Sequence, residues 1–284
     1  MRITTKTQAV KRHNTTLPRS AYLPINRCNL PAVILGSYTF QQHPVELTLD
    51  GVSVLHAELF SMLAPMQAPG ERAQRFMDYM DAHFLLNAPE DAGYDSHSRI
   101  DRTRADYKRI LRGWAFNPDG QEAAVLKGWV EARFGLTPRF HGEPIRSLDD
   151  ESYHAYQHSF ATGVYNTNSL EAQLDLLYTY SQYEIAKRHP GQTHITLYRG
   201  SNAIEPIPHP DNDKKQKLIL LNNINSLSTD PERAGEFGDS VYRFEVPLSK
   251  IFFYAELLPH YLKAENEFIV IGGVYASQRL LWPV

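Results

Sequence analysis

The spacing of apolar residues changes near residue 190, and this change constrains the fold more than any other feature of the chain. Before it, apolar residues recur at the three- and four-residue intervals of amphipathic helices; from His194 onward, short β-rich runs are separated by turn residues. Strands and helices therefore do not alternate as a parallel, doubly wound sheet requires. The sequence predicts an α+β fold, in which a helical N-terminal two-thirds packs with a β-rich C-terminal part.

Individual elements can be placed from the same spacing. Helical patterns cover 53–64, 71–86, 101–116, 121–134, 150–161 and 168–189, and β-rich runs cover 194–198, 217–221, 240–246, 251–254 and 268–274. Gly135 stands where a helix should end, and Asn168 is expected to cap the N-terminus of the last helix. Residues 27–55 mix short apolar runs with turn residues, which indicates irregular or short extended structure leading into the first helix.

The chain divides into three predicted segments. Basic residues without an apolar segment mark a flexible tail at 1–20, a mainly helical part covers 21–190, and a β-rich part covers 191–284. There is no internal repeat and no low-complexity tract. With 284 residues, 42% of them hydrophobic, the chain can bury a sizeable core. We expect one compact unit rather than independent domains.

Charge and cysteine content exclude several classes of function. The formal net charge of −3, from 29 basic and 32 acidic residues, gives no basic footprint for nucleic acid. Cys28 is the only cysteine, so an intrachain disulfide framework and a Cys-rich zinc site are excluded, as suits a reducing compartment. No apolar run approaches the roughly 18 residues of a membrane-spanning helix, and the first 20 residues lack the apolar segment that a signal peptide needs. We expect a cytoplasmic protein without a membrane span or a metal.

Two glutamates, Glu265 and Glu267, stand one residue apart directly before the β-branched run 268–271. In an extended strand, residues i and i+2 point to the same side, so both carboxylates can enter one site. Such a pair can divide two tasks, because one carboxylate can stabilise a developing positive charge while the other orients or deprotonates a nucleophile. Taken alone, such a pair is more typical of a polar strand end beside a turn.

Arg199 follows the strand-like run 194–198 and precedes Gly200, where the backbone is expected to turn. A permanently charged, forked donor at a strand end suits a phosphate or a ribose edge. The alternative is a surface ion pair. Gly-x-Gly-x-x-Gly and Walker-type loops are absent, so a nucleotide would not be held by a Rossmann or P-loop turn.

Ser226 and Ser228 alternate along a strand-like segment and therefore share one face. Hydroxyl groups donate and accept hydrogen bonds, so these serines can hold a carboxylate in place and contact a sugar. The segment also reads as a helix opening, with Thr229 or Asp230 as cap and Pro231 in the first turn. Both interpretations are compatible if Ser226 lies in the site and a later residue caps the helix.

The motifs follow one another in the order Arg199, Ser226 and Ser228, Ala234, Phe237 and Gly238, and then Glu265 and Glu267. This order resembles the Arg-Ser-Glu class of mono-ADP-ribosyltransferases, although Leu227 occupies a position where threonine is usual. The resemblance implies a core built as a two-sheet β-sandwich, with NAD as co-substrate. A glutamate rather than a glutamine at position 265 is similar to the members that modify arginine.

The resemblance also implies roles for the site residues. Glu267 would contact the ribose 2′-hydroxyl and stabilise the oxocarbenium-like cation, Ser226 would fix the Glu267 rotamer, and Glu265 would engage the acceptor arginine. Arg199 would bind the NAD phosphates or the adjoining ribose. The remaining residues assigned to NAD binding are Gly200, Ser228 and Phe237. The segment 255–264 would contact the protein substrate, through side chains such as those of Leu258, His260 and Tyr261.

The rest of the chain, including the run 26–31 and the helical front, resembles the members of this class that modify dinitrogenase reductase in nitrogen-fixing bacteria. The resemblance implies a regulator that attaches ADP-ribose to one arginine of the nitrogenase iron protein and inactivates it. It implies two protein partners, dinitrogenase reductase as substrate and a PII-type signalling protein.

Three alternatives stay open. The chain could be a catalytically silent NAD- or partner-binding module, or an arginine-specific toxin with another target. His154 and His158 have the i, i+4 spacing of zinc ligands on a helix, but the glutamate of a metalloprotease motif is missing. A surface histidine pair is the favoured interpretation.

Overall fold

The computed structural model describes residues 17–88, 91, 104–165, 167–202, 216–258 and 267–280. The predicted tail lies outside these residues as far as residue 16, and Arg19–Ala21 forms a short 3-10 turn. No helix in the described part of the chain is long and apolar enough to cross a membrane.

The C-terminal strands close into a barrel. They are β3 (His194–Ser201), β4 (Lys217–Ser228), β5 (Ser240–Pro247), β6 (Ile251–Tyr254) and β7 (Glu267–Arg279). Their order in the sheet is β4-β3-β5-β7-β6, and β4 also pairs with β7, so β4, β3, β5 and β7 form a closed antiparallel ring with β6 attached outside it. The α+β prediction is confirmed. A two-sheet β-sandwich was expected, but the described C-terminal strands β3 to β7 form a single sheet that is closed by the β4–β7 pairing.

A bulge and a glycine pair let the two longest strands bend around the ring. The β4–β7 register shifts between Leu221 and Ile224, opposite Gly272 and Gly273. A Cβ atom on Gly272 would lie 1.7 Å from the backbone oxygen of Asn222, so only glycine allows this approach. Bulges and glycines of this kind turn barrel corners. As a result, β7 pairs with β4 on one side and with β5 and β6 on the other.

Helices make up most of the chain before the barrel. They are α1 (Ala32–Leu35), α2 (Tyr38–Gln42), α3 (Val52–Leu55), α4 (Ala57–Leu63), α5 (Pro69–His83), α6 (Tyr107–Phe116), α7 (Gln121–Phe134), α8 (Glu151–Gly163) and α9 (Ser169–Arg188). A small hairpin of two strands with two residues each, β1 (Phe140–His141) and β2 (Glu143–Pro144), lies between α7 and α8. Helix α10 (Pro231–Gly235) follows β4.

The local predictions are partly confirmed. Gly135 ends α7 in the left-handed conformation, with φ 70°, as a C-cap glycine does. The predicted helix at 53–64 is divided at His56 into α3 and α4, and the expected irregular segment at 27–55 contains α1 and α2. Asn168 precedes α9 but makes no side-chain cap hydrogen bond.

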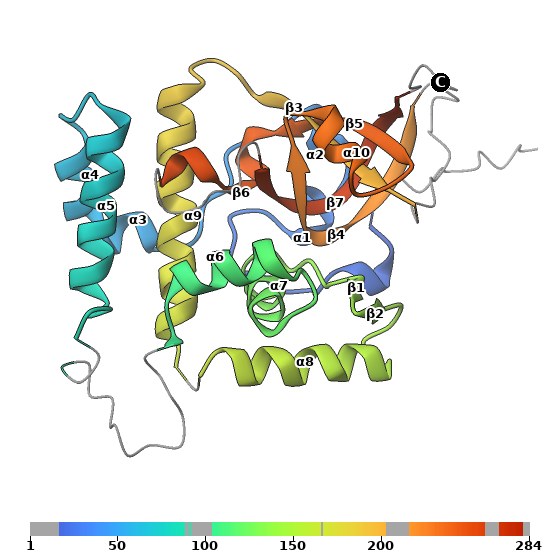
Figure 1. The fold of residues 1–284 in the computed structure, drawn as a ribbon, viewed down its shortest axis with the longest axis horizontal. Helices are drawn as coiled ribbons and strands as arrows, with labels where there is room; N and C mark the ends of the chain where they lie inside the picture. The colour runs from blue at the N-terminus through green and yellow to red at the C-terminus, as the bar shows by residue number, and fades with distance from the viewer. Residues whose placement is uncertain are drawn as a thin grey trace, which may run out of the picture.

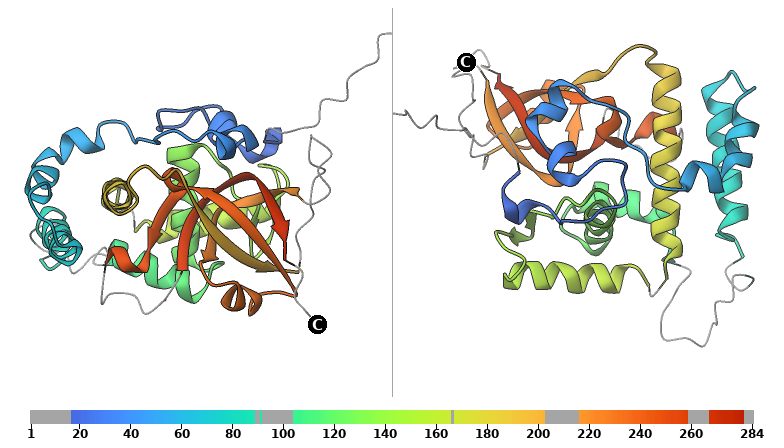
Figure 2. Two further views of the ribbon diagram at one scale, coloured as in Figure 1. Left: turned by 90° about the horizontal axis from the view of Figure 1, so that it is seen from above. Right: turned by 180° about the vertical axis from the view of Figure 1, so that it is seen from behind.

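The helices surround the barrel unevenly. Figure 1, and the view from above in Figure 2, place α9 between the barrel and the group α3 to α5, while α6, α7 and α8 lie along the lower side of the barrel. Helix α7 is buried along almost its whole length. Asn223, in the β4 bulge, donates its amide to the backbone oxygens of Lys127 (2.8 Å) and Leu136 (3.0 Å), which fixes α7 to the barrel.

One hydrophobic core extends through both parts of the chain. Trp129 of α7, for example, contacts Phe252 of β6 with 4.8 Å between ring centroids. Tyr178 of α9 donates its hydroxyl to the backbone oxygen of Ser249, at 2.8 Å, next to the start of β6. The barrel and the helical front therefore share one hydrophobic core.

Candidate active site

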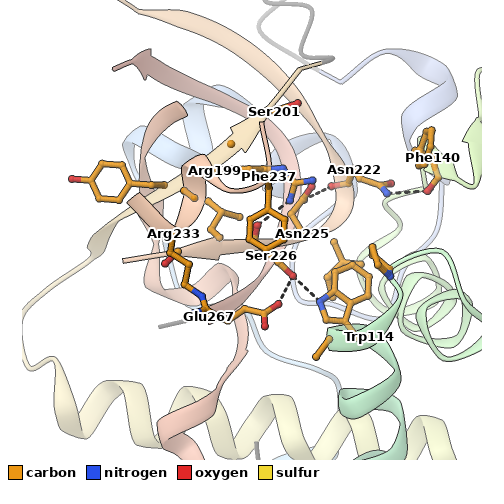
Figure 3. A pocket seen from close by; sticks show the side chains of 18 of the residues that line it. Trp114, Phe140, Arg199, Ser201, Asn222, Asn225, Ser226, Arg233, Phe237 and Glu267 are labelled. Atoms are coloured by element: carbon orange, nitrogen blue, oxygen red, sulfur yellow. Dashed lines mark hydrogen bonds between the residues drawn. The ribbon is translucent and has the colours of Figure 1, made fainter. Parts of the chain in front are cut away.

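A cavity of about 540 Å³ opens between the barrel and the helical front. Strands β3, β4 and β7 form its floor, and α6 and α10 stand at its margins (Figure 3). Six of the seven predicted site residues line it directly; they are Arg199, Gly200, Ser226, Ser228, Phe237 and Glu267. The structure thus brings the arginine, serine and glutamate motifs into one site.

Ser226 and Glu267 are joined by a short hydrogen bond. The Ser226 hydroxyl donates to Glu267 Oε1 at 2.5 Å, as Figure 3 shows. The contact follows from strand pairing, because Ser228 is opposite Glu267 in the β4–β7 ladder and Ser226 is opposite Ile269. Residues two apart on β4 share a face, so the Ser226 hydroxyl reaches the first residue of β7 diagonally. This bond fixes the orientation of the Glu267 carboxylate.

Arg199 supports the same serine from its backbone side. Its Nη1 group donates to the Ser226 backbone oxygen at 2.9 Å. Burial lowers the pKa of Arg199 from its ordinary value, but a guanidinium starts so high that it stays charged at neutral pH. In the described part of the chain, no carboxylate forms an ion pair with Arg199. The positive charge is therefore available to an anionic ligand in the cavity.

Ser228 and Asp230 organise the turn that leads into α10. Ser228 Oγ accepts from the Asp230 backbone N–H at 3.0 Å, and the Asp230 carboxylate accepts from the N–H groups of Glu232 (2.9 Å) and Arg233 (3.4 Å). The two interpretations of the serine segment are therefore compatible, with Ser226 in the cavity and Asp230 as the helix cap.

Gly200 brings α10 against β3. A Cβ atom at Gly200 would lie 2.0 Å from the backbone oxygen of Ala234, and one at Gly238 would lie 2.5 Å from the Ser201 backbone nitrogen. This close packing holds Phe237 at the cavity margin, where the residue is 74% exposed. An exposed aromatic ring beside a cavity is available for ligand contact.

Gly200→Ala is expected to displace α10 and with it Phe237. We expect NAD affinity to fall by about 10-fold or more, and overpacking to cost about 1–3 kcal/mol of stability. Isothermal titration with NAD and thermal unfolding would measure both effects. Gly70→Ala is a matched control, because a Cβ atom at Gly70 meets nothing within 4 Å. Unchanged NAD affinity in Gly200→Ala would contradict the role of this contact.

Part of the predicted acceptor side lies outside the described residues. Glu265, His260 and Tyr261 belong to this part. Leu258, which was expected to contact the protein substrate, is fully buried behind the short 3-10 turn at Ala255–Leu257. The prediction for Leu258 is therefore wrong, because its apolar side chain belongs to the core.

The helical front supplies cavity residues that the motifs did not indicate. Trp114 of α6 donates its indole N–H to Ser226 Oγ at 2.9 Å. Lys127 of α7 donates to the backbone oxygen of Pro118 (2.7 Å), to Asp119 Oδ1 (3.0 Å) and to His141 Nδ1 (3.1 Å). One signal for Lys127 was present, because it is the one charged residue in the apolar run 123–130. A tryptophan at helical spacing gives no such signal.

Burial lowers the pKa values of two side chains in this cluster. It lowers the pKa of Lys127, and burial together with the Lys127 charge lowers the pKa of His141 to about 4. His141 is therefore neutral at pH 7, and its Nδ1 atom accepts a hydrogen bond from the Lys127 amine at 3.1 Å. Within this cluster, Lys127 pairs with the Asp119 carboxylate at 3.0 Å.

The histidine pair on α8 lacks a third metal-ligating side chain in the described part of the chain. His154 and His158 both lie on the exposed face of the helix. Among the residues that the structure describes, no group of three or more His, Cys, Asp or Glu side chains could hold a metal ion. The pair is a feature of the protein surface.

An arginine, a serine and a glutamate lie in this chain order on adjoining strands around one cavity, which resembles the arrangement expected of the Arg-Ser-Glu mono-ADP-ribosyltransferases. The family model described as dinitrogenase reductase ADP-ribosyltransferase matches residues 25–279. The chain belongs to this family.

A curated relative agrees with the family model. The NAD(+)--dinitrogen-reductase ADP-D-ribosyltransferase of Rhodospirillum rubrum is 38% identical over 260 residues, which cover 88% of this chain and 92% of the relative. No solved structure matches the chain significantly. The likeness extends well beyond the three short motifs, because it includes the helical front.

Proposed function

We propose that this protein transfers ADP-ribose from NAD to an arginine of dinitrogenase reductase, and that the modification inactivates nitrogenase and so regulates nitrogen fixation. The observation that carries the proposal is the hydrogen bond from Ser226 to Glu267 beside the Arg199 guanidinium, in a chain of this family. The related enzyme from Rhodospirillum rubrum is named for this reaction.

The cavity has the properties that NAD requires. Its volume of about 540 Å³ lies within the usual range of small-molecule sites, roughly 300–1,000 Å³. Arg199 would hold the diphosphate or the adjoining ribose, since a guanidinium suits phosphate oxygens. Gly200 and Ser228 would border the dinucleotide, and Phe237 would stack on it. Holding the dinucleotide in this way would expose the bond between nicotinamide and ribose.

The chemistry assigned to the site is a substitution at the ribose C1′ atom. The bond from C1′ to the nicotinamide nitrogen breaks, its electron pair leaves with nicotinamide, and the ribose becomes oxocarbenium-like. The Glu267 carboxylate stabilises this positive charge. A guanidinium nitrogen of the acceptor then bonds to C1′. Since an arginine is protonated at neutral pH, it must lose a proton, and Glu265 is proposed to receive it.

Three wider aspects of the function are also proposed, and the first two rest on the family resemblance. A PII-type signalling protein is proposed as a second partner, and the cytoplasm as the site of action. We also propose that residues 21–190 and 191–284 work as one unit. The continuous hydrophobic core and the hydrogen bond from Trp114 to Ser226 support this last proposal.

The direct test incubates the purified protein with labelled NAD and purified dinitrogenase reductase. Label on dinitrogenase reductase is the expected result, together with stoichiometric release of nicotinamide. A silent binding module would bind NAD in a thermal-shift assay but release no nicotinamide. An arginine-specific toxin would label other arginine-bearing proteins and leave dinitrogenase reductase unlabelled. Either outcome would contradict the proposal.

Glu265→Gln is expected to separate the two carboxylate roles. Without a carboxylate to receive the proton of the acceptor, arginine transfer should be lost, whereas slow hydrolysis of NAD by water should remain because Glu267 is unchanged. Labelled transfer and nicotinamide release would be measured in parallel. Retention of full transfer would show that Glu265 does not act on the acceptor, and loss of both activities would assign it to bond cleavage instead.

A further inference from the structure

The hydrogen bonds around the candidate catalytic carboxylate begin on the helical front. Trp114 is 3% exposed, and its Nε1 atom lies 2.9 Å from Ser226 Oγ, which in turn lies 2.5 Å from Glu267 Oε1. Figure 3 shows the Ser226 hydroxyl between the Trp114 indole and the Glu267 carboxylate, with a hydrogen bond to each. The indole belongs to α6, about 110 residues before the serine in the chain.

The protons in this chain of hydrogen bonds can be assigned from chemistry alone. An indole N–H is only a donor, whereas a hydroxyl has one proton and two lone pairs. Because Trp114 donates to the Ser226 oxygen, the single hydroxyl proton is left to make the contact with Glu267. The Ser226 backbone oxygen is held by Arg199 at 2.9 Å. Ser226 is thus fixed at both ends, and its hydroxyl has one direction in which to donate.

The position of Trp114 is itself determined by the packing of α6. Arg109 forms an ion pair with Glu122 of α7 at 2.6 Å, and the Tyr107 backbone N–H donates to Gln173 Oε1 of α9 at 2.8 Å. Gly113, the neighbour of Trp114, has no side chain, and a Cβ atom there would lie 2.4 Å from the Glu122 side chain. Helix α6 therefore lies tightly against α7, with the indole directed at the barrel.

We infer that Trp114 is a positioning residue for the transferase reaction: its indole N–H orients the Ser226 hydroxyl so that it donates to Glu267 and holds the carboxylate beside the ribose. This inference rests on the proposed function. The alternative is a purely structural role, because a buried indole N–H needs a hydrogen-bond partner in any case. In that case the substitution of Trp114 would lower stability and leave the chemical step unaffected. The two roles differ in which kinetic constant they change.

Trp114→Phe removes the N–H and keeps an aromatic ring in the core. We expect kcat for transfer and for nicotinamide release to fall by about 10- to 100-fold, because misplacement of a reacting group has effects of this size. The KM and Kd for NAD should stay within about twofold. In Trp114→Phe/Ser226→Ala, the loss should not exceed that of Ser226→Ala alone, since both changes remove the same link.

Trp129→Phe is the matched control. The Trp129 indole is also fully buried and donates to Asp175 Oδ1 at 2.7 Å, but it does not line the cavity. Its replacement should lower the melting temperature and leave kcat unchanged. Should Trp114→Phe fail to fold, the benzothienyl analogue of tryptophan at position 114 provides the second test, because it replaces only the N–H by sulfur.

The inference is overturned if either substitution at position 114 folds and keeps wild-type kcat, or if the loss appears in KM and Kd for NAD alone. Wild-type protein in the same assay separates this outcome from failure of the proposed function. If wild type releases nicotinamide and labels its target, only the role of Trp114 is rejected. If wild type binds NAD without releasing nicotinamide, the transferase function itself is rejected, and the inference with it.

Discussion

Glu267→Gln is expected to lower ADP-ribosyl transfer by about 10³-fold or more while leaving NAD affinity largely intact. Glutamine has the size and shape of glutamate, and its amide oxygen can accept the hydrogen bond that Ser226 now donates to Glu267 Oε1 at 2.5 Å. The geometry of the site is therefore preserved and only the negative charge is lost. Since this charge is proposed to stabilise the cationic transition state, its loss should affect kcat far more than ground-state binding.

Single-turnover transfer of labelled ADP-ribose and calorimetric titration with NAD would measure the two effects separately. Glu245→Gln is a suitable control, because Glu245 lies on β5, is half exposed and pairs with Arg243 outside the cavity. It should retain wild-type transfer. Full transfer activity in the Glu267→Gln protein would remove Glu267 from the mechanism, and loss of NAD binding would make it a binding residue instead.

The strands were predictable individually, but their closure into a ring was not. Alternating and β-branched residues mark where a strand runs, and the run at 240–246 agrees with β5 to within one residue. Such a pattern says nothing about which strand pairs with which. Closure depends on the approach of Gly272 to the Asn222 backbone and on the bulge beside it, and the glycine pair in the sequence does not indicate which backbone it approaches.

The site was predictable to the extent that its residues belong to short motifs in strands. Arg199, Ser226 and Glu267 could be grouped from their order along the chain, and the structure brings them together. Trp114 and Lys127 could not be assigned to the same site, because helical spacing shows only that a residue faces the core. Which barrel residue meets that face depends on how α6 and α7 dock, and this is a property of the tertiary packing.

Lys250 gives rise to the largest expected effect on stability. Its side chain is 1% exposed, and its Nζ group donates to the Gly272 backbone oxygen at 2.7 Å. The Tyr275 and Phe40 rings lie 4.8 Å and 5.5 Å from the ammonium. No carboxylate in the described part of the chain forms an ion pair with it. Burial lowers the pKa of Lys250 from its ordinary value of 10.5 to about 7.

The direction of the pH effect follows from these two values. Between pH 7 and 10.5, the unfolded chain keeps the Lys250 proton while the folded chain releases it. The free energy of unfolding therefore increases as the pH rises through that window, because the folded protein no longer holds a buried charge. Lys250 destabilises the folded state most below pH 7, where its buried amine is protonated. Tyr275 and Tyr178 have pKa values raised by burial and act in the opposite direction at high pH. A comparison between two variants cancels their contribution.

Lys250→Met should accordingly stabilise the protein at pH 7, by about 1–4 kcal/mol, because an apolar side chain of similar length replaces a desolvated amine. The advantage over wild type should shrink steadily between pH 7 and pH 10, because the folded wild-type protein releases the Lys250 proton in this range while the unfolded chain keeps it. Denaturant unfolding at several pH values would measure it. Lys217→Met, which removes an exposed charge from β4, controls for net charge and should show no such trend. If wild type and Lys250→Met have parallel pH dependences, Lys250 does not change its protonation on folding, and the cation must be stabilised by the aromatic rings and the Gly272 oxygen.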